Sequence, residues 1–87
     1  MNMIDLWVMR AMEWFPSRAI LEVRYAEDAS GRIQYVGVMP DGADTALTNA
    51  IIGKVEYSSN ANPSRVRTYH SSNKPLAIWD DRSSLLP

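Results

Sequence analysis

The side chains that could do chemistry in this chain are few. Asp80 and Asp81 are adjacent carboxylates, His70 is the single histidine, and there is no cysteine. A metal site needs oxygens that converge from several positions, and a catalytic acid pair must face each other across a substrate. Neighbours on a strand point to opposite faces, so a strand-end turn beside Arg82 is the simpler interpretation. No nucleophile motif accompanies His70. We therefore expect no catalytic centre, no metal site and no cofactor, and we expect that the protein is not an enzyme.

Four basic side chains could line one face of a predicted sheet and meet phosphate groups: Arg24, Lys54, Arg65 and Arg67. Tyr57 and Tyr69 could then stack on bases, as in small β-barrels that bind nucleic acid. Glu22 and Glu56 fall on similar faces, however, so cross-strand charge pairing explains the pattern equally well. Nine basic and ten acidic residues give a net charge of −1. This balance lacks the basic excess of nucleic-acid-binding proteins, and it argues against a nucleic-acid partner.

The chain is short for building a core of its own. Its 87 residues suit a single domain, and a domain of this size hides a smaller share of its surface than a larger one does. Without cysteine there is no disulfide and no thiolate zinc site, so association with a partner is the remaining way to stabilise it. No apolar run approaches the roughly 20 residues that cross a bilayer, and the N-terminus lacks a basic n-region. These features argue against a membrane partner and a signal peptide.

Residues 1–16 are predicted to form an amphipathic helix that serves as a docking arm. Asn2 with Asp5 gives a cap-like start, and Pro16 ends the helix. The apolar side chains span about half the circumference, which is wider than the roughly 100° stripe that a surface helix needs. We therefore expect the helix to dock on a neighbouring subunit, and we expect Trp7→Asp to abolish assembly while the sheet stays folded. Six residues are assigned to this interface: Ile4, Trp7, Val8, Met12, Trp14 and Phe15.

After the helix the hydrophobic period changes from 3.6 to 2, which predicts two β-hairpins and a short last strand. The alternating segments are residues 21–25, 33–39, 51–57 and 66–70, followed by an apolar run at 76–79. The predicted turns between them are residues 27–31, 40–42, 58–63 and 71–75, and residues 43–49 are expected to form a loop or one helical turn. Together these elements predict a mainly β (α+β) fold in which the strands form a small barrel or a curled sheet.

The domain organisation follows from the same pattern. Residues 17–82 are predicted to form the small β domain, and residues 83–87 a C-terminal tail. Trp79 with Arg82 is expected to hold the last strand in place, while Asp80 caps or turns its end.

Four motifs mark residues 34–85: Tyr35-Val36-Gly37, Ala43-Asp44-Thr45-Ala46, Ile52-Gly53-Lys54-Val55-Glu56-Tyr57 and Ile78-Trp79-Asp80-Asp81-Arg82-Ser83-Ser84-Leu85. In this order the motifs resemble those of a recurring type of small bacteriophage protein, and the closing motif is the specific one. The chain departs from that pattern at Ile51, where relatives carry Trp, and at Tyr69-His70-Ser71-Ser72, where they tend to have Trp-Ala-Asp-Gly. The resemblance implies a phage-encoded protein of the virion, made in the host cytoplasm, and it implies no catalytic residues.

We therefore expect an accessory structural protein of a bacteriophage virion that binds neighbouring subunits through its apolar helix and sheet surface. The expected partners are other virion proteins and further copies of the chain, in a homo-oligomer or a symmetric assembly. The alternative is a small nucleic-acid- or ligand-binding β-barrel that acts in the infected cell. A salt-dependent shift in the electrophoretic mobility of an oligonucleotide would favour this alternative over the structural role.

Overall fold

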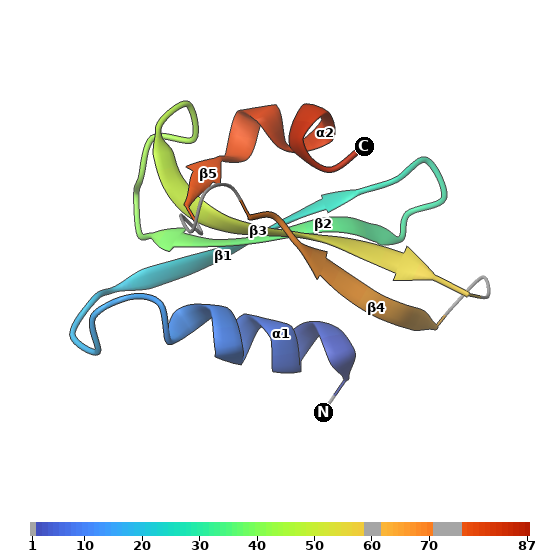
Figure 1. The fold of residues 1–87 in the computed structure, drawn as a ribbon, viewed down its shortest axis with the longest axis horizontal. Coiled ribbons are helices and arrows are strands. Elements are labelled where there is room, and N and C mark those ends of the chain that lie inside the picture. The colour runs from blue at the N-terminus through green and yellow to red at the C-terminus, as the bar shows by residue number, and fades with distance from the viewer. Residues whose placement is uncertain (1, 59–61, 71–75) are drawn as a thin grey trace.

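The computed structural model describes residues 2–58, 62–70 and 76–87. The elements are α1 (Met3–Met12), β1 (Leu21–Glu27), β2 (Ile33–Pro40), β3 (Thr48–Tyr57), β4 (Pro63–Thr68), β5 (Ala77–Ile78), the short 3₁₀ helix η1 (Trp79–Asp81) and α2 (Arg82–Leu85). The middle of the turn predicted at 58–63 and the whole loop predicted at 71–75 lie outside the described residues. The elements form three layers, with α1 on one side of the sheet and the C-terminal segment on the other (Figure 1).

A single antiparallel sheet carries the fold, with the strand order β1-β2-β3-β4 and with β5 pairing with β3. β5 pairs with the first residues of β3, and β4 pairs with Gly53 and the residues that follow it. Among the described residues, β1 and β4 do not pair with each other, so the sheet stays open. The predicted mainly β fold is therefore confirmed in its curled-sheet form and not as a closed barrel.

The first face of the sheet packs against α1. The Asn2 side chain accepts a hydrogen bond from the Asp5 N–H at 2.8 Å, which confirms the predicted cap. The buried residues between α1 and the sheet are Ile4, Val8, Ala11, Val36, Val38, Ile51 and Val55. Trp7 approaches the backbone of Gly53 so closely that a Cβ added there would lie 2.9 Å from the indole ring. The indole N–H donates to Thr68 Oγ1 at 2.9 Å, which ties α1 to β4.

The C-terminal segment covers part of the second face. Trp79 lies over Gly37, where an added Cβ would come within 2.6 Å of two ring carbons. The Tyr35 hydroxyl donates to the carbonyl of Leu86 at 2.6 Å. The prediction that residues 83–87 form a tail is wrong, because α2 occupies most of this segment and Leu86 is only 4% exposed. One helical turn is too short to show a periodic pattern in the sequence.

The close approach at Gly53 gives a direct test of the packing of α1. In Gly53→Ala the new Cβ would lie 2.6 Å from Val66 Cγ1, besides its contact with Trp7. We expect a loss of about 1–3 kcal/mol in the free energy of unfolding, as is usual for overpacked sites. Urea denaturation followed by tryptophan fluorescence measures this loss.

A double-mutant cycle with Val66→Ala provides the control, since shortening Val66 removes one of the two clashes. The cost of Gly53→Ala should fall by more than about 0.5 kcal/mol in that background. An equal cost in both backgrounds would contradict the described contact.

Candidate functional site

The side chains of α1 that point away from the sheet are largely apolar. Four of them form what we call the outer face of α1: Met3, Leu6, Met9 and Met12, which are 39%, 41%, 52% and 38% exposed. Their spacing of three residues makes each the neighbour of the next, in a row that winds around the helix by about 60° per step. A helix with apolar side chains on more than one face ordinarily buries more than one face. In the described chain, however, α1 is covered only by the sheet (Figure 1).

Two charged residues flank Leu6 and Met9, the central pair of this outer face, on opposite sides. At 100° per residue, Asp5 lies about 80° to one side of the outward direction and Arg10 about 60° to the other. Among the described residues, neither side chain takes part in an ion pair. Both charges are therefore available to a partner that covers Leu6 and Met9.

The six residues assigned to the interface from the sequence divide between the two sides of α1. Ile4 and Val8 are buried against the sheet, and Trp7 and Phe15 pack against the same core. Met12 and Trp14 are exposed, Trp14 at 63%. The Trp7→Asp variant is thus expected to disturb the fold itself and not assembly alone, since Trp7 bridges α1 and β4.

Leu6 and Met9 were missed by the sequence reasoning. The helical angle places both opposite Ile4, among the polar residues, where two apolar side chains stand out. A count of apolar residues on the polar side of the helix would have found them.

Two hollows adjoin α1, one beside it and one at its C-terminal end. One of about 250 Å³ lies between α1 and β4, beside Trp7, Trp14 and Thr68. Another of about 490 Å³ lies at the C-terminal end of α1, beside Phe15 and Leu21. The apolar surface around α1 is therefore uneven, with recesses that a partner's side chains can enter.

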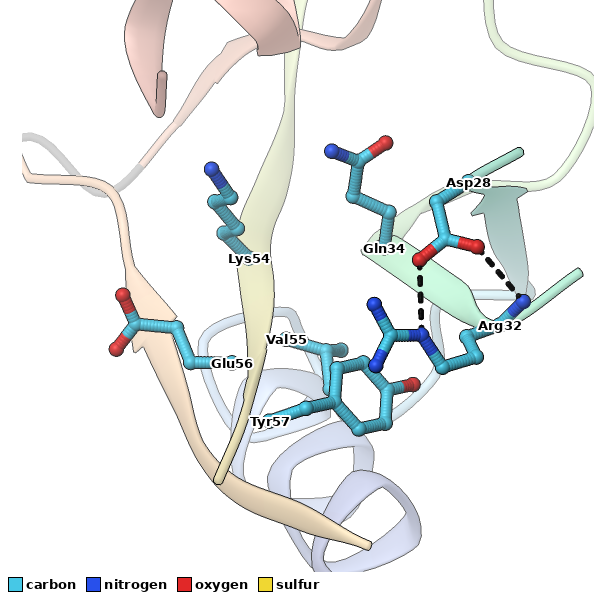
Figure 2. Close-up of a pocket in the computed structure, with 7 residues that line it drawn as sticks. All are labelled: Asp28, Arg32, Gln34, Lys54, Val55, Glu56 and Tyr57. Atoms are coloured by element: carbon cyan, nitrogen blue, oxygen red, sulfur yellow. Dashed lines mark hydrogen bonds and ion pairs between the residues drawn. The ribbon is translucent and has the colours of Figure 1, made fainter. Parts of the chain in front are cut away.

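A separate polar pocket of about 310 Å³ opens at the end of the sheet where β2 and β3 stop pairing. Their ladder ends at Tyr35 and Lys54, and the Tyr57 hydroxyl donates to the Ile33 carbonyl at 2.7 Å. The residues that line this pocket are Asp28, Arg32, Gln34, Lys54, Val55, Glu56 and Tyr57 (Figure 2).

A β-bulge brings Gln34 to this pocket. Ala26 pairs with Tyr35 and Glu27 pairs with Ile33, so Gln34 is the extra residue on β2. A bulge lets two successive side chains leave the strand toward the same side, and bulges often redirect a side chain beside a functional site. Figure 2 shows Gln34 and Lys54 extending to the same side of the sheet.

The two carboxylates at the pocket are both held by arginines. Asp28 accepts from Arg32 Nε and from the Arg32 N–H, each at 3.0 Å. The backbone hydrogen bond from Arg32 is the main cause that lowers the pKa of Asp28. Glu56 accepts a hydrogen bond from Arg65, which lowers its pKa, and it points toward β4 (Figure 2). Glu56 is therefore turned away from the pocket, whereas the Asp28 carboxylate lies between Gln34 and Arg32 and offsets part of the Arg32 charge (Figure 2).

The basic groups at the pocket are engaged differently. The Arg32 guanidinium lies 4.4 Å above the Tyr57 ring, which fixes its plane. Lys54 forms no ion pair with a carboxylate in the described part of the chain. Arg32, Gln34 and Lys54 thus present hydrogen-bond donors around one opening, and the arrangement can hold an anion.

The remaining residues considered from the sequence lie elsewhere. His70 is exposed after β4, and Asp80 and Asp81 are exposed in η1. The Arg82 guanidinium lies 4.7 Å from the Trp79 ring centre, and its Nη1 donates to the Trp79 carbonyl at 3.2 Å. This contact ties α2 to the residue that covers Gly37.

Comparison with known proteins finds no matching family model, no similar curated protein and no similar solved structure. Within the described residues, no helix has the length and apolar character needed to cross a membrane.

The lowered pKa of Asp28 predicts a pH dependence of stability. A carboxylate whose pKa is lower in the folded state stabilises the protein above its unfolded pKa, and this contribution is lost as the pH falls through the folded value. Asp28→Asn should therefore have a lower melting temperature than the wild type at neutral pH. Below about pH 4 the two melting temperatures should converge, because Asp28 of the wild type then becomes protonated. Thermal melts by circular dichroism at a series of pH values measure this.

Asp44→Asn is a suitable control for this series, since Asp44 also lies in a turn and its side chain bonds the Ala46 N–H. If the difference in melting temperature between wild type and Asp28→Asn stays constant down to pH 2, the ionised Asp28 carboxylate does not stabilise the fold.

Proposed function

We propose that this protein is a self-associating structural building block in which α1 pairs with α1 of a second copy. The observation that carries the proposal is the outer face of α1, a row of exposed apolar side chains in which Leu6 and Met9 lie opposite the core. Contiguous exposed apolar surface is typical of sites where proteins associate, and methionine is favoured there. The role is one of binding and not of catalysis.

The two charges that flank Leu6 and Met9 favour one orientation of the pair. With Leu6 and Met9 at the contact, Asp5 and Arg10 take the flanking positions, five residues apart, that exchange charge contacts in parallel coiled coils. In a parallel two-fold pair, Asp5 of each copy lies on the same side as Arg10 of the other. In an antiparallel pair, Asp5 would lie beside Asp5 and Arg10 beside Arg10. The charges therefore support the parallel arrangement.

The pairing is expected to be weak on its own. α1 has only ten residues, and Glu13 just beyond it would approach its counterpart in the second copy. One helix face of this length is smaller than the roughly 800 Å² per partner that stable interfaces bury. Such a contact gains strength where many copies are held near one another, as in a symmetric assembly.

The resemblance of residues 34–85 to small bacteriophage proteins supports a virion as that assembly. In this setting the protein is an accessory structural component, made in the host cytoplasm, and other virion proteins are its further partners. Quantitative mass spectrometry of purified particles tests the setting, because a structural component is present at a defined ratio to the major capsid protein.

Charge variants test the self-association. Asp5→Arg makes both flanking positions basic, and Arg10→Asp makes both acidic. We expect each variant alone to be monomeric, because like charges then meet at the interface, and an equimolar mixture to form a heterodimer. Sedimentation velocity over a range of concentrations measures the species, and the wild-type dimer should weaken as salt is raised.

Leu6→Glu and Ser17→Glu form the matched control pair. Both place a carboxylate at an exposed position, but only Leu6 lies on the outer face. Self-association should be lost in Leu6→Glu and kept in Ser17→Glu. A wild-type chain that stays monomeric at millimolar concentration, or a dimer unchanged by Leu6→Glu, would show that the proposal is wrong.

A further inference from the structure

We propose that the polar pocket between β2 and β3 binds a phosphate group, held by Arg32, Gln34 and Lys54. This site lies on a different part of the molecule from α1 and does not depend on self-association. The same chemistry is supplied by a free phosphate compound such as a mononucleotide and by the backbone of a single-stranded nucleic acid.

The donors around the pocket suit a phosphate. The Arg32 guanidinium is held in one plane by Asp28 and by the Tyr57 ring, so its remaining N–H groups are preorganised. The Gln34 amide and the Lys54 ammonium lie on other sides of the opening (Figure 2). Donors from several directions match the oxygens of a tetrahedral phosphate better than those of a planar carboxylate. The volume of about 310 Å³ leaves room for the group that carries the phosphate.

The strands beside the pocket carry a small basic excess. On the second face of the sheet they bear four basic and two acidic side chains: Arg24, Lys54, Arg65 and Arg67 against Glu22 and Glu56. The C-terminal segment adds Arg82 but also the exposed Asp80 and Asp81, so the basic excess lies on the strands. Arg65 and Arg67 pair with Glu56, which leaves Lys54 as the cation of β3 that is free to meet an anion in the described part of the chain.

Lys54 has cations as neighbours on two sides. It pairs directly with Arg67 across β3 and β4, and like charges in that position repel each other. The Lys54 ammonium lies 5.9 Å from the Tyr35 ring centre, and the Arg82 guanidinium lies 6.0 Å from the same centre. Neither Lys54 nor Arg82 has an ion pair with a carboxylate among the described residues. A bound phosphate would offset this concentration of positive charge.

Titration of the full-length protein tests the proposal with defined probes. Inorganic phosphate, a mononucleotide and a short single-stranded oligonucleotide are added in low salt, and backbone amide shifts are followed by NMR. We expect the amides of Arg32, Gln34 and Lys54 to shift with all three probes. Tighter binding of the oligonucleotide with a steep salt dependence would identify a nucleic-acid backbone as the source. If the mononucleotide binds as tightly as the oligonucleotide, the source of the phosphate is a small phosphate compound.

Lys54→Met keeps the aliphatic stem and removes the charge, and Gln34→Ala removes the amide. Lys54→Met should weaken binding roughly tenfold, and Gln34→Ala should weaken it less. Arg18→Ala is the matched control, since Arg18 is an exposed cation in the segment between α1 and β1. Equal losses in Lys54→Met and Arg18→Ala would overturn the proposal. Tighter binding of an acidic peptide than of any phosphate probe, or no amide shift with any probe, would overturn it too.

Discussion

The structure depends on the close approach of two tryptophan rings to bare backbone on opposite faces of the sheet. Trp7 lies against Gly53 in β3, and Trp79 lies against Gly37 in β2. These neighbouring central strands pair directly, with Gly37 opposite Ile52 and Gly53 opposite Val36. Since interiors are close-packed, a side chain at either glycine would push a whole layer outward. The two glycines therefore set how closely α1 and the C-terminal segment cover the sheet.

This arrangement divides the second face of the sheet into two parts. Near Gly37 the apolar side chains of the C-terminal segment cover the sheet. The Tyr35 hydroxyl donates a hydrogen bond to the Leu86 carbonyl of this segment. Toward the far end of β3 no described element covers the face, and Lys54 and Glu56 project from it (Figure 2). The boundary between these parts falls at Tyr35. Its side chain is buried, and the cationic groups of Lys54 and Arg82 lie near its ring. The apolar and the charged parts thus share one strand pair.

The two proposed binding surfaces lie on different parts of the molecule and differ in chemistry. The outer face of α1 is a strip of flexible apolar side chains, which suits contact with another protein. The polar pocket is bordered by side chains held in place by a bulge and by an arginine stacked on tyrosine. A single small domain can therefore contact a second copy through α1 and an anion at the end of the sheet, without competition between them.

Much of the fold could be predicted from the sequence because its elements have clear local periods. The alternation around Leu21–Glu27 and Ile33–Pro40 marks a half-buried hairpin, and the apolar residues before Pro16 have helical spacing. α2 could not be predicted in this way, since it has four residues and is stabilised by burial of Leu86. The interface residues were predicted only in part, because periodicity shows which faces of a helix are apolar and not which of them its own sheet covers.

The sequence by itself therefore determined the class of fold, the helix cap at Asn2 and the succession of strands, all of which depend on neighbours in the chain. Only the tertiary structure decided that Leu6 and Met9 stay exposed while Ile4 and Val8 are buried. It also decided that Gln34 joins Lys54 at one pocket, because a bulge changes the side on which a residue lies without leaving a mark in the hydrophobic pattern. Contacts between distant segments settle such questions, and local spacing carries no information about them.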